Sequence, residues 1–153
     1  MQTPLVVAEL TRLFCVEVDA VQAYATAVAL VGPGAIRDEL TLFGLEHQRH
    51  AVVIEEQITR RGHSAPDVEP DVKGVVIGAL TPPSRPLELE DVLTGLRGNE
   101  QLTGSLYAKA LAKKLPDDLR EILAAMHGEE RRHLDWTERT LARRAWETSG
   151  VHP

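Results

Sequence analysis

Apolar residues recur along four long segments of the chain at the spacing of one helical face. In the first segment the positions Val6, Leu10 and Leu13 begin such a series. A repeat of about 3.6 residues is typical of amphipathic helices, and none of the segments shows the sustained alternation of a β-strand. The predicted helices cover residues 4–31, 35–61, 88–114 and 117–147.

The links between these helices differ in length. Residues 31–36 (VGPGAI) and 115–118 (LPDD) are short breaks, whereas the crossover 62–87 is long and rich in Pro and Gly. Two short links and one long link predict an all-α four-helix bundle with a crossover between the second and third helices, in a single domain spanning 1–153. The apolar middle of the crossover, residues 72–80, is expected to pack across the bundle as a strap. The sequence is compatible with either a short strand-like or a short helical conformation there.

Polar side chains occupy the middle of each apolar stripe, where Leu or Ile is expected. Ionisable groups cost several kcal/mol to bury without partners, so they are normally paired, neutralised or bound to metal. A single such position could reflect a wrong helical register, but six of them spread over all four helices are hard to explain in that way. The acids and imidazoles are Glu17, His47, His50, Glu100, Glu130 and His133, and Tyr24 and Tyr107 accompany them.

These polar positions form an internal repeat with an offset of 83 residues. The repeat includes both tyrosines of the chain, so common residue types do not account for it. Helix pairs repeated in this way are expected to lie about a pseudo-twofold axis, each supplying half of one central site. The matched positions are Glu17 with Glu100, Tyr24 with Tyr107, His47 with Glu130, and His50 with His133.

Carboxylates and imidazoles together suit divalent iron, manganese or zinc, whereas an oxygen-only set favours magnesium or calcium. Six such ligands are too many for one ion but suit two divalent transition metal ions. In such a site Glu17 and Glu100 are terminal or bridging ligands, Glu130 bridges, and His50 and His133 each bind one metal. The two tyrosines are placed to hydrogen-bond the ligating carboxylates.

The pattern resembles the ferritin-like superfamily, in particular the bacterioferritin and rubrerythrin-type di-iron proteins. In those proteins a Glu from each of two helices joins a Glu-x-x-His from each of the other two. The segment GEERRHLDWTERTL (128–141) looks like the last bundle helix of bacterioferritins, and EVDAVQAY (17–24) looks like the first. The layout is also similar to bacterial ferritin-like domains of unknown function. The resemblance covers nearly all of residues 4–147 and implies a di-iron site.

The chain departs from that pattern in its second helix, where LEHQRH places His47 at the position of a glutamate. Both the helical register and the 83-residue offset select His47, with the adjacent Glu46 as the alternative ligand. A histidine there leaves three negative ligand charges against two divalent metals, which favours the reduced state or weakens the second metal. Gln48 stands where bacterioferritins carry their haem-ligating Met, so no haem is expected.

Other features narrow the class of protein. The tail AWETSGVHP is short for the fifth helix of cage-forming ferritins, so a 24-subunit cage is not expected, while a homodimer through a bundle face is compatible with the sequence. Asp135 and Trp136 are read as structural or as neighbours of the ligands. Three further acids and three further histidines are predicted at the surface: Glu55, Glu56, Glu129, His63, His127 and His152. Of these, Glu56 is also a candidate to bond a metal ligand from outside the site.

The composition of the chain excludes several classes of partner and site. The 17 Lys and Arg against 23 Asp and Glu leave the chain acidic, so nucleic acid is not expected as a partner. A single cysteine, Cys15, excludes an internal disulfide and any Cys-x-x-Cys metal site. Glu9 and Arg12 interrupt the first apolar run, and no membrane association is expected. We therefore expect a soluble, cytoplasmic protein.

Three functions are compatible with these observations. The first is a di-iron protein in which ferrous ions react with dioxygen or hydrogen peroxide. The second is a non-catalytic metal-binding or stress-associated bundle whose site is structural or vestigial, which His47 favours. The third is a helical adaptor without metal, in which Glu17→Ala and His133→Ala are tolerated or stabilising.

Overall fold

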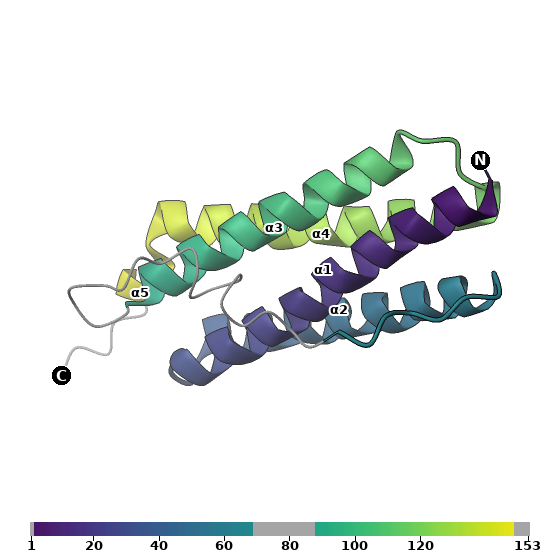
Figure 1. Cartoon of the computed structure of the whole chain (residues 1–153). Helices are drawn as coiled ribbons and strands as arrows, with labels where there is room; N and C mark the ends of the chain where they lie inside the picture. The colour runs from purple at the N-terminus through teal and green to yellow at the C-terminus, as the bar shows by residue number, and fades with distance from the viewer. Residues whose placement is uncertain (1, 69–87, 149–153) are drawn as a thin grey trace.

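The computed structural model describes residues 2–68 and 88–148, and within them four long helices form an elongated bundle (Figure 1). This part of the chain contains no strand, so the predicted all-α four-helix bundle is confirmed. The helices are α1 (Thr3–Leu30), α2 (Ala35–Thr59), α3 (Leu89–Leu111) and α4 (Asp117–Arg143), followed by the short α5 (Ala145–Thr148).

The four helices are arranged as two antiparallel pairs. The short links hold α1 against α2 and α3 against α4, and α1 also packs on α3. The end of α2 and the start of α3, which the crossover connects, lie at opposite ends of the bundle (Figure 1). Most of that connection, residues 69–87, and with it the predicted strap at 72–80, lies outside the described residues.

The last long helix ends earlier than its apolar pattern indicates. Arg144 interrupts the helix in the left-handed region, with φ of 44°, and α5 follows it. Its guanidinium forms ion pairs with Glu90 at 3.0 Å and Glu147 at 2.6 Å, and its Cζ lies 5.3 Å from the centre of the Trp146 ring. These contacts accompany a backbone conformation that is uncommon for a residue with a side chain. The periodicity alone does not reveal this break.

The apolar core is divided into two clusters, one toward each end of the bundle. Each cluster takes residues from both helix pairs, so its burial holds the pairs together. The buried members of the larger cluster are Val6, Leu10, Leu13, Phe14, Ala51, Ile54, Ile58, Tyr107, Ala110, Leu115, Leu119, Leu123 and Met126. Those of the smaller are Ala23, Tyr24, Ala27, Leu40, Phe43, Val92, Leu93 and Leu96.

Helix α1 is long and apolar enough to pass a composition test for a membrane span, with a mean hydropathy of 1.5 over the tested window. In the bundle, however, 44% of that window is buried. The buried side chains of the helix include Glu9 and Glu17. An apolar helix of this kind is expected in a bundle core, and α1 does not indicate a membrane protein.

Candidate metal centre

The six acid and imidazole positions of the apolar stripes lie together between the two core clusters. Each of the six side chains is at most 1% exposed. Helices α1 and α3 each supply one of them, and α2 and α4 each supply two, spaced three residues apart so that both face inward. The residues are Glu17, His47, His50, Glu100, Glu130 and His133.

One half of the cluster is built around Glu17 and His50, and we call it the Glu17 half. With His47 and Glu130 these residues offer four ligand atoms that all lie within 4.8 Å of one another. His50 Nδ1 is 2.9 Å from Glu130 Oε1 and 3.2 Å from Glu17 Oε1. The candidate ligands of this half are therefore hydrogen-bonded to one another.

The other half is built around Glu100 and His133, and we call it the Glu100 half. These residues join the same His47 and Glu130 in a second set of four atoms within 4.8 Å. His133 Nδ1 lies 3.7 Å from Glu100 Oε1, beyond hydrogen-bond distance. The two halves thus share His47 and Glu130, which are also the positions at which the internal repeat differs in residue type.

His47 lies between the halves with one ring nitrogen toward each. Its Nδ1 is 2.7 Å from Glu17 Oε2, and its Nε2 is 3.1 Å from Glu100 Oε1. The side chain of Glu46, the alternative at this place, is 28% exposed and lies at the edge of the cluster. The structure therefore places the imidazole of His47, and not the carboxylate of Glu46, in the centre.

The two tyrosines bond the carboxylates across the bundle. The Tyr107 hydroxyl on α3 donates to Glu17 Oε1 on α1 at 2.5 Å. The Tyr24 hydroxyl on α1 donates to Glu100 on α3. Burial, together with the adjacent carboxylate, raises the pKa of each phenol well above its ordinary value, so both act as neutral donors.

Outer carboxylates bond the far nitrogens of two histidines, also across the bundle. Glu46 contacts His133 Nε2, and Glu129 contacts His50 Nε2. Such partners fix the tautomer and the ring orientation of a ligating histidine. Glu129 was predicted at the surface, but its side chain is only 28% exposed and takes part in this contact.

An arginine completes each outer contact. Arg132 donates to Glu46 at 2.6 Å, and Arg49 donates to Glu129. The 83-residue offset relates these residues too, because EHQRH (46–50) and EERRH (129–133) share their first, fourth and fifth residues. Extending the repeat by one residue before the first predicted ligand of each pair, to Glu46 and Glu129, is the sequence signal that could have identified Glu129.

Mutual hydrogen bonds control the charge of the cluster. Burial alone raises the pKa of Glu17, but hydrogen bonds with His47 and His50 outweigh it and lower that pKa to about 2. Burial likewise opposes a charge on His50, yet its bonds to Glu130 and Glu17 raise its pKa to about 10. Burial raises the pKa of Glu130 to about 8 against the pull of His47. Without metal, protons therefore occupy several of the candidate ligand atoms at neutral pH.

The donor atoms fit a cation. Among the residues that the structure describes, Glu100 Oε2, Glu130 Oε2 and His133 Nδ1 are buried and have no hydrogen-bond partner. Buried polar atoms of this kind are normally satisfied, and a metal ion would satisfy all three. Their mixture of carboxylate and imidazole suits a divalent transition metal.

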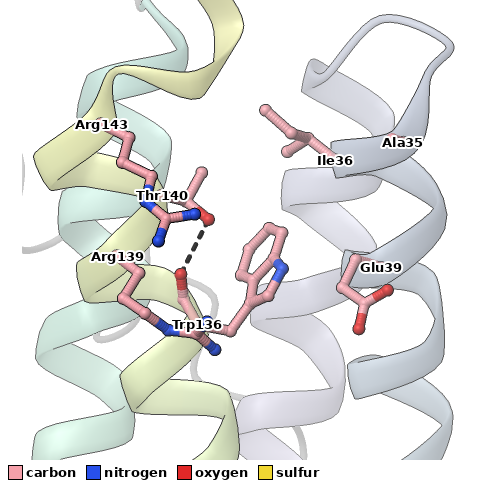
Figure 2. A pocket seen from close by; sticks show the side chains of 7 residues that line it. All are labelled: Ala35, Ile36, Glu39, Trp136, Arg139, Thr140 and Arg143. Carbon is pink, nitrogen blue, oxygen red and sulfur yellow. Dashed lines mark hydrogen bonds between the residues drawn. The ribbon is translucent and has the colours of Figure 1, made fainter.

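A pocket of about 340 Å³ lies beside the centre, between the start of α2 and the end of α4 (Figure 2). The Trp136 indole projects into it from α4, with Ile36 on the facing helix. Trp136 packs edge-on against Phe43 with ring centres 5.3 Å apart, and Phe43 lies 4.2 Å from the His133 ring. These rings close the end of the cluster, and none of the six candidate ligands lines the pocket.

Comparison with known proteins supports the fold. No protein-family model and no curated protein matches the chain. Among solved structures, the chain is similar to a ferritin-like, diiron-carboxylate protein from Bacillus anthracis str. Ames, with a TM-score of 0.72 and 21% identity. The match covers 92% of this chain and 99% of that one.

The resemblance seen in the sequence is thus confirmed for the fold. Together with the buried Glu and His cluster, it suggests dimetal binding. The chain has the ferritin-like fold of the diiron-carboxylate proteins.

Proposed function

We propose that this chain binds two divalent transition metal ions, iron in the first instance, at the centre formed by the six buried residues. The observation that carries the proposal is the set of overlapping ligand groups, with three buried donor atoms that have no partner in the described part of the chain. In the Glu17 half the ligands are Glu17 and His50, and in the Glu100 half they are Glu100 and His133. His47 and Glu130 lie between the halves and belong to both groups of candidate ligands.

The chemistry proposed for the site is oxidation of ferrous iron by dioxygen or hydrogen peroxide. Bound ferrous ions would supply the electrons for that reaction. The protein would hold the ions away from bulk water, since all six candidate ligands are buried. Tyr24 and Tyr107 would orient Glu100 and Glu17 through their hydrogen bonds.

A second candidate function is non-catalytic metal binding, and His47 is the observation that favours it. A neutral imidazole in place of a bridging carboxylate removes one negative charge that would stabilise the oxidised metals. In that case the centre holds metal for structure or storage without turnover. We further propose a cytoplasmic protein without haem that forms a homodimer and not a 24-subunit cage.

The test is metal analysis of the purified protein, followed by anaerobic titration with Fe(II) and exposure to air or hydrogen peroxide. The proposed oxidation requires two irons per chain and an oxo-bridged absorbance after oxidant is added. Two bound metals without that absorbance would instead select the non-catalytic function. Absence of retained metal, with no change in thermal stability on adding iron, would contradict both.

A further inference from the structure

The internal repeat is broken at the two shared ligands, and this makes the halves of the centre different. The offset of 83 residues relates His47 to Glu130, so an imidazole in one helix pair corresponds to a carboxylate in the other. The remaining candidate ligands are identical in type between the pairs. Any difference in metal affinity between the halves should therefore originate at His47 and Glu130.

In the Glu17 half, hydrogen bonds already occupy the ligand atoms. Glu17 Oε2 is 2.7 Å from His47 Nδ1, and its Oε1 accepts from the Tyr107 hydroxyl. His50 Nδ1 bonds both Glu17 and Glu130. A metal ion entering this half has to displace the bonds that His47 and His50 make with these carboxylates.

The Glu100 half is less fully bonded. Glu100 Oε1 accepts from the Tyr24 hydroxyl and lies 3.1 Å from His47 Nε2, but other ligand atoms of this half have no partner in the described part of the chain. Glu100 Oε2, Glu130 Oε2 and His133 Nδ1 are buried and make no hydrogen bond within the described residues. All three are atoms of candidate ligands in this half. A metal ion entering here would gain three donors with no protein hydrogen bond to break at those atoms.

The orientation of His47 adds a fourth donor to the same half. Its Nδ1 bonds Glu17 at 2.7 Å, and its Nε2 makes only the longer contact of 3.1 Å with Glu100 Oε1, which belongs to the same half. A metal ion bound between these two atoms would replace that contact. A carboxylate that accepts from one ring nitrogen leaves the other nitrogen available to a metal and raises its basicity. Glu17 then acts on the Glu100 half as the residue that orients His47, and one of its oxygens is withdrawn from its own half.

We propose that the centre fills in two unequal steps, with the first metal ion bound by His47 Nε2, Glu100, Glu130 and His133. The Glu17 half takes the second ion more weakly. This inference rests on the proposed metal-binding function and specifies its order. Two imidazoles and two carboxylates favour iron, manganese, cobalt or zinc over magnesium and calcium.

The experiment is an anaerobic titration of the metal-free full chain with Co(II), followed by visible absorbance and calorimetry. The repeat supplies a matched pair of variants, His133→Ala and His50→Ala. We expect wild type to bind in two resolved steps, with the first weakened about 100-fold or more by His133→Ala and changed by less than about 10-fold by His50→Ala. Equal effects of the two variants, or loss of the first step only in His50→Ala, would overturn the proposal.

Further variants guard against misfolding and address His47 directly. His133→Asn and His50→Asn keep a polar atom near the Nδ1 position, and circular dichroism of each metal-free variant checks the fold. His47→Glu restores the repeat, so the affinities of its two steps should approach each other. If they remain as far apart as in wild type, His47 is not the cause and the proposal is wrong.

Crystals grown with one equivalent of Co(II) give an independent readout. The anomalous peak should lie beside His133, and a peak beside His50 or equal peaks at both would contradict the order. If no Co(II) binds to wild type at all, the proposed function itself fails. Two bound ions with equal affinities would agree with the proposed metal binding but contradict the proposed order of filling.

Discussion

At the scale of single residues, protons and metal ions compete for the same buried atoms. Hydrogen bonds to carboxylates raise the pKa of His50 to about 10, and burial raises the pKa of Glu130 to about 8. Both groups therefore hold a proton at neutral pH when no metal is bound. A metal ligand must be deprotonated, so binding has to expel these protons. The pH therefore controls access to the centre.

The first prediction concerns this competition. As pH rises from about 6 to about 8, the apparent affinity for Co(II) or Zn(II) should increase, because fewer protons remain to be displaced. Calorimetry in buffers of different ionisation enthalpy should show at least one proton released per chain at pH 7. An affinity that is constant over this range, with no proton release, would show that the cluster is not protonated as described.

The outer carboxylates give a second prediction at this scale. Glu46→Gln and Glu129→Gln keep the side-chain shape but remove the charge that orients His133 and His50 respectively. Each should weaken metal binding by about 10–100-fold, Glu46→Gln in the first step and Glu129→Gln in the second. The control is Glu55→Gln, an exposed acid on α2. If all three variants bind metal equally in a Co(II) titration, the outer contacts do not position the histidines.

At the scale of the helices, the same apolar stripe that packs the bundle also aims the ligands inward. Leu93 on α3 is fully buried in the smaller cluster, seven residues before Glu100 on the same face. Seven residues are close to two helical turns. The register that buries the leucine therefore buries the glutamate as well.

The prediction at this scale is a loss of stability on truncating that stripe. Leu93→Ala should lower the free energy of unfolding by about 2–5 kcal/mol through lost burial and an unfilled cavity. Leu102→Ala on the same helix should change it by less than about 0.5 kcal/mol, because Leu102 is 54% exposed. Urea denaturation of the metal-free proteins measures both. Similar losses for the two variants would show that the helical register is wrong.

The apolar periodicity and the internal repeat therefore predict most of the fold. They predict less well the details that depend on contacts between helices. The burial of His47 follows from register, since one step along a helix to Glu46 turns the side chain about 100° away. Glu129 was missed because a residue at the edge of a stripe looks like a surface charge until its partner, His50, is known. The break at Arg144 depends on contacts with α3 and α5 that no local pattern contains.

At the scale of the whole molecule, the centre connects both helix pairs. Its six residues come from all four long helices, so a bound metal ties α1 and α2 to α3 and α4. Without metal, the same position contains buried ionisable groups that cost more than apolar residues of similar volume. The middle of the bundle should therefore be its least stable part in the metal-free protein, and bound metal ions should stabilise it.

The last prediction follows from this coupling. A ligand that binds only the folded chain stabilises it by about 2.7 kcal/mol when its free concentration is 100 times its dissociation constant. The melting temperature of the metal-free protein should therefore rise on adding Co(II), and rise further with concentration, as followed by circular dichroism at 222 nm. Glu100→Ala removes a carboxylate of the Glu100 half and should lose most of this response, whereas the exposed Glu55→Gln should keep it. Magnesium at the same concentration should have little effect, because two imidazoles suit it poorly. An equal rise with magnesium, or in Glu100→Ala, would mean that the metals act at the surface and not at the buried centre.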